Sequence, residues 1–255
     1  SGLTYSEVAL KLFTAVKQIK GESVNLNLIQ GENSQPVSHE GWSDLLEQHV
    51  REEGKVSYRG FIQDSLKLNN YLSLLSSQPP AENWSEKEQI AYWINAYNAF
   101  TVKLIVDNYP LKSIKELGEG LPMINSPWDI KFFKIADEPF DLNTIEHEIL
   151  RKQFEEPRIH FAINCASVSC PVLRNEAYDA NSLEQQLEEQ TIAFLYDPSK
   201  NLITGKETQL SKIFDWFKSD FTNRGELVSF LKRYRPELDV NTTVEYLPYD
   251  WALNE

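Results

Sequence analysis

Several features that would assign a function at once are missing from this 255-residue sequence. It has 25 Lys and Arg against 38 Asp and Glu, which gives a formal net charge of -13, and no basic cluster reverses that balance locally. Because such a chain repels polyanions, we expect neither a nucleic-acid partner nor an anionic membrane surface. No run of 18 apolar residues occurs, so we also expect no transmembrane segment.

Cysteine is scarce as well, since only Cys165 and Cys170 occur. Two cysteines exclude a disulfide-rich scaffold but leave the redox compartment open. The chain starts at Ser1 and its one methionine is Met123, so we expect a processed product from which an export signal could have been removed. Signatures of phosphate-binding loops, serine-hydrolase elbows and HExxH metalloproteases are absent, and we expect no cofactor and no metal.

The composition is that of a globular protein, with 41% hydrophobic residues and 12% aromatic residues. Helical patterns outnumber strand patterns and do not alternate with them, which predicts a mainly helical α+β fold with a small antiparallel sheet. The segment 157–166 is equally compatible with helix and strand. Predicted helices cover residues 6–20, 41–51, 59–76, 86–108, 113–117, 143–153, 182–195, 213–221 and 226–234, and predicted strands cover 24–29, 55–58, 131–135, 138–141, 202–204, 208–210 and 242–249.

Two capping signatures begin predicted helices, Ser85 with Glu88 and Asn143 with Glu146. The helix after Ser85 is apolar on almost every side, so it should be central and buried. Glu146 falls within the apolar arc of its own helix. It is therefore either the reciprocal capping group or a buried carboxylate that needs a partner, such as His160 or an arginine.

A polar stripe interrupts the central helix, because Asn95, Asn98 and Thr101 are spaced three residues apart. Buried amides cost free energy unless they are hydrogen-bonded, so the stripe needs specific partners. Two interpretations remain open. The amides either bond to neighbouring loops and lock the fold, or they line a binding site.

The segment from Arg158 to Pro171 carries the most chemistry. In helix and in strand geometry alike, His160 shares a face with Asn164, whose amide can fix the imidazole tautomer. Both geometries place Cys165 with an aromatic residue, and a cysteine in apolar surroundings keeps a raised pKa. The small residues that follow Cys165 would leave this end of the element open to a ligand.

Cys165 and Cys170 allow four interpretations: a disulfide in an exported chain, a zinc site with His147 or His160, plain buried cysteines, or a reactive thiol. Thiol catalysis needs a thiolate, an imidazole and a group that orients the imidazole. His147 lies at the edge of an apolar arc, where it can face a cleft. His39 and His49 are expected to be solvated.

Two segments, 214–221 and 246–251, are dense in aromatic residues and punctuated by aspartates. Such patches can hold sugars or peptides by stacking and carboxylate contacts, although aromatics at helical spacing are commonly core residues.

These motifs together resemble the domain of unknown function 547 family, over residues 60–255 and most densely over 84–198. The resemblance implies an N-terminal helical extension over residues 1–58 and a domain over 59–255, whose core is 84–198 and on which C-terminal helices and a strand pack. It implies a bacterial member, and exported or periplasmic location is favoured, since bacterial relatives often carry export signals. The matching segments are Tyr92–Ala99, Ile145–His147 with Leu150–Arg151, Arg158–Cys165 and Ser169–Leu173.

The resemblance also implies a shared set of site residues. Cys170 looks replaceable, because plant relatives carry serine at the matching place. That weakens the disulfide and zinc interpretations and favours Cys165 if a thiol acts. The implied set consists of Asn95, Asn98, His147, Arg151, His160, Asn164 and Cys165.

The leading hypothesis is a thiol-dependent hydrolase or transferase acting on an acyl or amide bond. Cys165 is the nucleophile, His147 or His160 is the base, and Asn164, Asn95 or Glu146 orients it. The alternative is a non-catalytic module that binds a peptide, sugar or cell-envelope fragment. In that case the asparagine stripe, His160 and Arg151 form a polar pocket for a small molecule or peptide. A purely structural hydrogen-bond network is the third interpretation.

Overall fold

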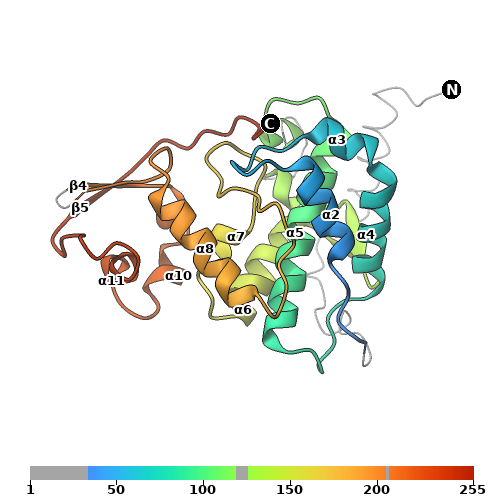
Figure 1. Ribbon diagram of the computed structural model, residues 1–255, viewed down its shortest axis with the longest axis horizontal. Coiled ribbons are helices and arrows are strands. Elements are labelled where there is room, and N and C mark those ends of the chain that lie inside the picture. Colours follow the sequence, from blue (N-terminus) through green and yellow to red (C-terminus); the bar gives the residue numbers. More distant parts are fainter. Residues whose placement is uncertain (1–33, 119–125, 205–206) are drawn as a thin grey trace.

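The computed structural model describes residues 34–118, 126–204 and 207–255 (Figure 1). Its first half is helical, with α2 (Glu40–His49), α3 (Tyr58–Gln63), α4 (Ser65–Ser77) and α5 (Glu86–Asn108). Helix α5 begins at the predicted capping box, in which the Ser85 amide donates to Glu88 (2.6 Å) and the Glu88 amide donates to Ser85 Oγ (3.3 Å). It is buried on all sides along most of its length, as predicted. The helix predicted over residues 6–20 lies outside the described residues.

Short elements form the middle of the chain. They include the hairpin of β1 (Phe133–Ile135) and β2 (Glu138–Phe140), whose turn residues Ala136 and Asp137 both have positive φ, 50° and 66°. This geometry suits the right-handed twist of a two-residue hairpin, and it confirms the predicted turn. The other elements are η2 (Ile114–Gly118), η3 (Pro127–Asp129), η4 (Thr144–Leu150), α6 (Arg151–Gln153) and α7 (Ile159–Ala162).

The C-terminal part combines helices with a three-stranded sheet in the order β3-β4-β5. Strands β3 and β4 are antiparallel, whereas β5 pairs with β4 in parallel because the chain passes through three helices before returning. The prediction of a mainly helical α+β fold with a small sheet is confirmed. The elements are α8 (Leu183–Tyr196), β3 (Leu202–Ile203), β4 (Glu207–Leu210), α9 (Ile213–Trp216), α10 (Lys218–Thr222), α11 (Leu227–Lys232) and β5 (Thr243–Tyr246).

Two hydrophobic cores fill the described part of the chain, and α7 lies between them. Ile159 and Ala162 of α7 pack in the larger core, around α5, while Phe161 packs in the smaller core with the C-terminal helices. Trp42 of α2 belongs to the larger core too. The division of the chain at residue 58 stays a prediction. No described helix combines the length and the apolar character that crossing a bilayer requires.

The two N-terminal histidines are not solvated, contrary to expectation. His49 is buried, and its Nε2 lies 2.8 Å from Asp64 Oδ2. His39 Nδ1 lies 2.7 Å from the hydroxyl of Tyr71, and burial lowers the pKa of His39 to about 4. Helix α2 packs on α3 and α4 and brings both imidazoles into contact with them, an outcome that helical spacing alone does not reveal.

The asparagines of α5 fasten two distant segments to the helix. Asn95 donates to the carbonyl of Tyr178 (2.8 Å) and accepts from its amide (2.9 Å). Asn98 donates to the carbonyl of Ala162 (3.0 Å) and accepts from the amide of Asn164 (2.8 Å). Both amides are thus used by backbone groups, which confirms that they lock the fold. Thr101 Oγ1, by contrast, is buried without a partner.

The C-terminal tail returns across the molecule after β5 and ends beside α3 (Figure 1). Asn254 accepts from the Tyr58 hydroxyl (2.7 Å), and its carbonyl accepts from the Val56 amide (2.9 Å). On the way, the Ala252 carbonyl accepts from the Val168 amide (2.8 Å). The tail therefore fixes the loop that follows α7.

Replacing Asn98 tests the fastening role of α5. Asn98→Ala leaves the Ala162 carbonyl and the Asn164 amide unsatisfied, so we expect the free energy of unfolding to fall by about 2 to 5 kcal/mol. Urea denaturation measures this change. The exposed Asn69→Ala on α4 is the control, and a loss as small as that control's would contradict the assignment.

Candidate functional site

The site begins in η4, which is a π-helix rather than the predicted α-helix. The Arg151 amide donates to the carbonyl of Glu146, five residues back. The predicted capping by Asn143 and Glu146 is wrong: the Asn143 side chain bonds to Asp129, and Asp141 Oδ1 instead accepts from the Thr144 amide (2.6 Å). Wide turns of this kind are frequent at functional sites. Here the turn carries Glu146 as a buried carboxylate.

Asp220, on α10, connects the two residues with the most chemistry. Its Oδ2 accepts from Arg151 Nε (2.6 Å) and lies 2.8 Å from His160 Nε2, and its Oδ1 accepts from Arg151 Nη2 (2.9 Å). Burial alone would raise the pKa of Asp220, but the hydrogen bonds from Arg151 and His160 outweigh it and hold this pKa well below its usual range. An ionised Asp220 only accepts, so His160 Nε2 carries the proton.

His160 is almost fully buried, with 2% of its surface exposed. The ring of Phe217 stacks on it with ring centroids 4.0 Å apart. Burial lowers the pKa of His160, although Asp220 opposes this shift. The imidazole is therefore neutral near pH 7, and its Nδ1 has a free lone pair. That Nδ1 atom makes no hydrogen bond.

The group that faces this free nitrogen is Glu146. Its Oε1 lies 3.9 Å from His160 Nδ1, and its Oε2 lies 3.5 Å from the Tyr97 hydroxyl. Burial raises the pKa of Glu146 to about 7, and the charge of Arg151 only partly opposes it. At neutral pH a neutral base thus lies beside a carboxyl that is half protonated.

His147 stands on the outer side of the same cluster. Its Nδ1 lies 2.7 Å from Arg151 Nη1, and burial followed by the Arg151 charge lowers the pKa of His147. Arg151 is then fully engaged, by Asp220 on two nitrogens and by His147 on the third.

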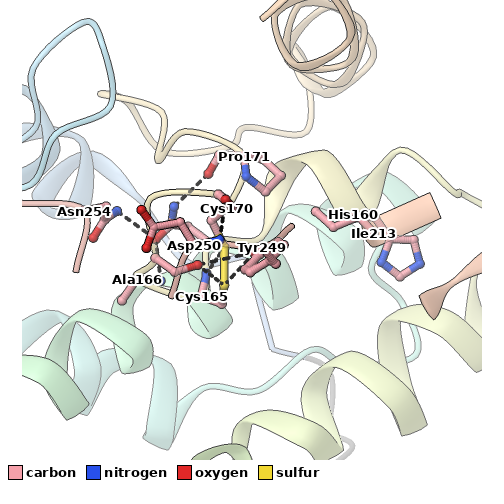
Figure 2. The surroundings of a disulfide bond; sticks show 12 residues. His160, Cys165, Ala166, Cys170, Pro171, Ile213, Tyr249, Asp250 and Asn254 are labelled. Atoms are coloured by element: carbon pink, nitrogen blue, oxygen red, sulfur yellow. Dashed lines mark hydrogen bonds between the residues drawn. A yellow bond between two sulfur atoms is a disulfide. The ribbon is translucent and has the colours of Figure 1, made fainter. Parts of the chain in front are cut away.

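Cys165 lies in the loop after α7 and forms a disulfide with Cys170 (Figure 2). The Cys165 sulfur is 3.1 Å from Ser167 Oγ and 3.3 Å from the Tyr249 hydroxyl. Neither imidazole hydrogen-bonds to it, and Figure 2 shows His160 to one side of the disulfide. The resemblance weakened the disulfide interpretation, and in this respect its implication was wrong.

The expected pair of His160 and Asn164 does not form, because α7 ends at Ala162 and the backbone is extended at Ile163. Asn164 instead shapes the disulfide loop: it donates to the Pro171 carbonyl (2.7 Å) and accepts from the amide of Ala166 (2.9 Å). Ala166 has a positive φ of 62°, which is strained for a residue with a side chain.

Residues 81–195 match the model of a family described as "Protein of unknown function, DUF547". This part of the chain belongs to the DUF547 family. No curated protein and no solved structure matches the chain. The DUF547 domain contains Tyr97, Glu146, Arg151, His160 and the disulfide, as the resemblance implied.

Two site residues come from outside the DUF547 match and were not predicted. Asp220 and Tyr249 follow it in the chain, and both belong to the two aromatic segments that aspartates punctuate. That punctuation was the available signal, but it did not identify the partners. In the described ranges, no three His, Cys, Asp or Glu side chains gather in a way that could hold a metal ion.

The raised pKa of Glu146 predicts a pH-dependent stability. In the folded state the carboxyl titrates near 7 rather than at its ordinary 4.5, so the folded state holds an extra proton between these values. Stability is therefore highest at and below pH 4.5 and falls by about 3 kcal/mol as the pH rises to about 7. Urea denaturation across this range should show the fall in the parent protein but not in Glu146→Gln. The neighbouring exposed Glu148→Gln should keep it, and its loss there would contradict the assignment.

The disulfide predicts the response of the cysteines to alkylation. Iodoacetamide should label neither Cys165 nor Cys170 in the folded protein, and it should label both after reduction and denaturation. Intact mass spectrometry with peptide mapping measures this. Labelling of either cysteine before reduction would show that the bond is absent in solution.

Proposed function

We propose that the DUF547 domain, completed by Asp220, is a hydrolase or transferase that acts on an acyl or amide bond. His160 is the general base and Glu146 is the general acid. The observation that carries the proposal is the buried, unpartnered Nδ1 of His160, which lies 3.9 Å from Glu146 while Asp220 holds the other ring nitrogen. A base and an acid whose protonation states both suit neutral pH are what such a reaction needs.

The proposed reaction balances with water as the nucleophile. His160 Nδ1 accepts a proton from water as its oxygen attacks the carbonyl carbon of the substrate. Glu146 donates its proton to the nitrogen or oxygen of the leaving group as the carbon–heteroatom bond breaks. The proton then passes from His160 to Glu146 and restores the starting state. Asp220 orients His160 and stabilises the imidazolium that forms. In a transferase, an acceptor hydroxyl or amine takes the place of water.

The sulfur of Cys165 has a different place in this scheme from the one the sequence favoured. A disulfide has no thiolate, so Cys165 cannot attack a carbonyl while it is bonded to Cys170. Thiol catalysis would require reduction and movement of an imidazole toward the sulfur. The disulfide also supports our proposal that the protein works in an oxidising compartment, such as the periplasm or the extracellular space.

The alternative is a binding module without catalysis. Its original form, with Arg151 capturing a carboxylate, is disfavoured because Asp220 and His147 already occupy Arg151. A module that grips its ligand with aromatic rings remains the competing proposal. Ligand binding without any turnover would favour it.

A substrate panel tests the catalytic proposal. The parent protein should turn over at least one member of a panel of esters, N-acyl amino acids and N-acetylated sugars. For that substrate, His160→Gln and Glu146→Gln should lower kcat by about 10²- to 10⁴-fold, the usual contribution of a positioned acid or base. Glu148→Gln is the matched control, and thermal unfolding checks that each variant is folded.

The role of the cysteines is tested on the same substrate. Cys165→Ser combined with Cys170→Ser should retain activity, and reductant should not be required. Activity that appears only with reductant and disappears in Cys165→Ser would replace this proposal with the thiol mechanism.

The pH profile should also follow the raised pKa of Glu146. Because the acid must be protonated, kcat/KM should fall as the pH rises through about 7. Titration of free His160 should lower it on the acid side, below the ordinary imidazole value of 6.5. Rates measured from pH 5 to 9 test both limbs, and a flat profile between pH 6 and 9 would contradict the assignment of Glu146.

A further inference from the structure

Four aromatic side chains from three separate segments meet near the site; we call Trp128, Trp216, Tyr249 and Trp251 the aromatic cluster. The ring centroids of Tyr249 and Trp251 are 4.5 Å apart, and those of Trp216 and Tyr249 are 4.8 Å apart. Trp251 also stacks on Trp216 at 5.8 Å and meets Trp128 edge-on at 5.5 Å. Element η3, helix α9 and the C-terminal tail each contribute to the cluster.

The aromatic cluster is not buried like the rest of the aromatic side chains. Trp216 has 46% of its surface exposed and is the most exposed tryptophan of the chain, while Trp128, Tyr249 and Trp251 are partly exposed. Trp42, Trp84 and Trp93, in contrast, are buried. Large exposed apolar surfaces on a monomer commonly mark binding sites.

Charges around the aromatic cluster narrow the chemistry of its ligand. Each tryptophan has an aspartate as its chain neighbour: Asp129, Asp215 and Asp250. The ammonium of Lys115 already lies over the Trp251 ring, 4.8 Å from its centroid. Lys115 disfavours a cationic ligand and the aspartates disfavour an anionic one. A neutral ligand with an apolar face and hydroxyl groups fits best, because the face can stack on the rings and the hydroxyls can donate to carboxylates.

The aromatic cluster is directly connected to Glu146. Tyr249 contacts the disulfide loop, and the negative charge of Glu146 contributes to the raised pKa of Tyr249. Trp128 interacts with the Tyr97 hydroxyl, which lies 3.5 Å from Glu146 Oε2. A ligand on these rings would therefore lie next to the acid and base.

We propose that the aromatic cluster binds a neutral saccharide ring of the substrate, so that the bond cleaved or transferred is an acyl or amide group attached to a sugar. This inference rests on the proposed function for the reaction, but saccharide binding itself can be measured separately. The single exposed ring that carries most of the stacking face is Trp216.

Calorimetric titration of the Glu146→Gln variant tests saccharide binding without turnover. The probes are triacetylchitotriose, which carries N-acetyl groups, and cellotriose, which does not. We expect triacetylchitotriose to bind, and adding Trp216→Ala to weaken its binding by about tenfold, the loss expected for one stacked ring. The matched control is Tyr196→Ala, which removes an aromatic side chain with 53% exposure outside the aromatic cluster and should leave binding unchanged.

The outcomes separate this inference from the proposed function. Absence of binding by both oligosaccharides, or equal binding with and without Trp216, would overturn the saccharide site. A tripeptide with a central tryptophan that binds where the sugars do not would also overturn it, in favour of a peptide ligand. Saccharide binding with no turnover by the parent protein would uphold the site and refute the catalytic proposal. Turnover of simple esters without saccharide binding would do the reverse.

Discussion

The carboxylate of Asp220 is the group on which the arrangement of this site depends. It accepts two hydrogen bonds from Arg151 and one from His160, and it belongs to a helix of the smaller core, whereas Arg151 follows the π-helix of the larger one. An ion pair of this kind is partly buried, so removing one partner leaves an uncompensated charge that costs about 3 to 5 kcal/mol. Asp220 thus couples the position of the C-terminal helices to the protonation and orientation of His160.

That coupling explains why one nitrogen of His160 is left free. With Nε2 held by Asp220 and the ring stacked under Phe217, the imidazole cannot rotate to find another partner for Nδ1. The π-helix then brings Glu146 to the opposite edge of the ring, where burial keeps its carboxyl partly protonated. Three elements far apart in the chain therefore produce one acid and one base with complementary protonation states.

Local sequence signals predicted much of the fold and only part of the site. The capping box at Ser85 and the unbroken apolar character after it identified α5, and the turn at Ala136 and Asp137 was predicted between two short strands. The π-helix was not predictable, because its residues also fit an α-helix and only tertiary contacts favour the wider turn. The pairing of His160 was missed for a similar reason. Its partner lies 60 residues later, and the end of α7 after Ala162 removes Asn164 from the face that helical or strand spacing gives it.

The distinction between a structural network and a catalytic one can be argued from the polar atoms left without partners. In the described part of the chain, the buried unpartnered side-chain atoms are Trp42 Nε1, Thr101 Oγ1, Tyr178 OH and His160 Nδ1. The first three carry their own proton and belong to groups that stay neutral at physiological pH, so each costs stability and offers no proton transfer. His160 Nδ1 is different, because it is a lone pair on a titratable ring that faces a titratable carboxyl. A network that served only the fold would gain by closing this 3.9 Å gap to hydrogen-bonding distance, as it does at Asp220. The open gap is the feature that a reacting group would fill.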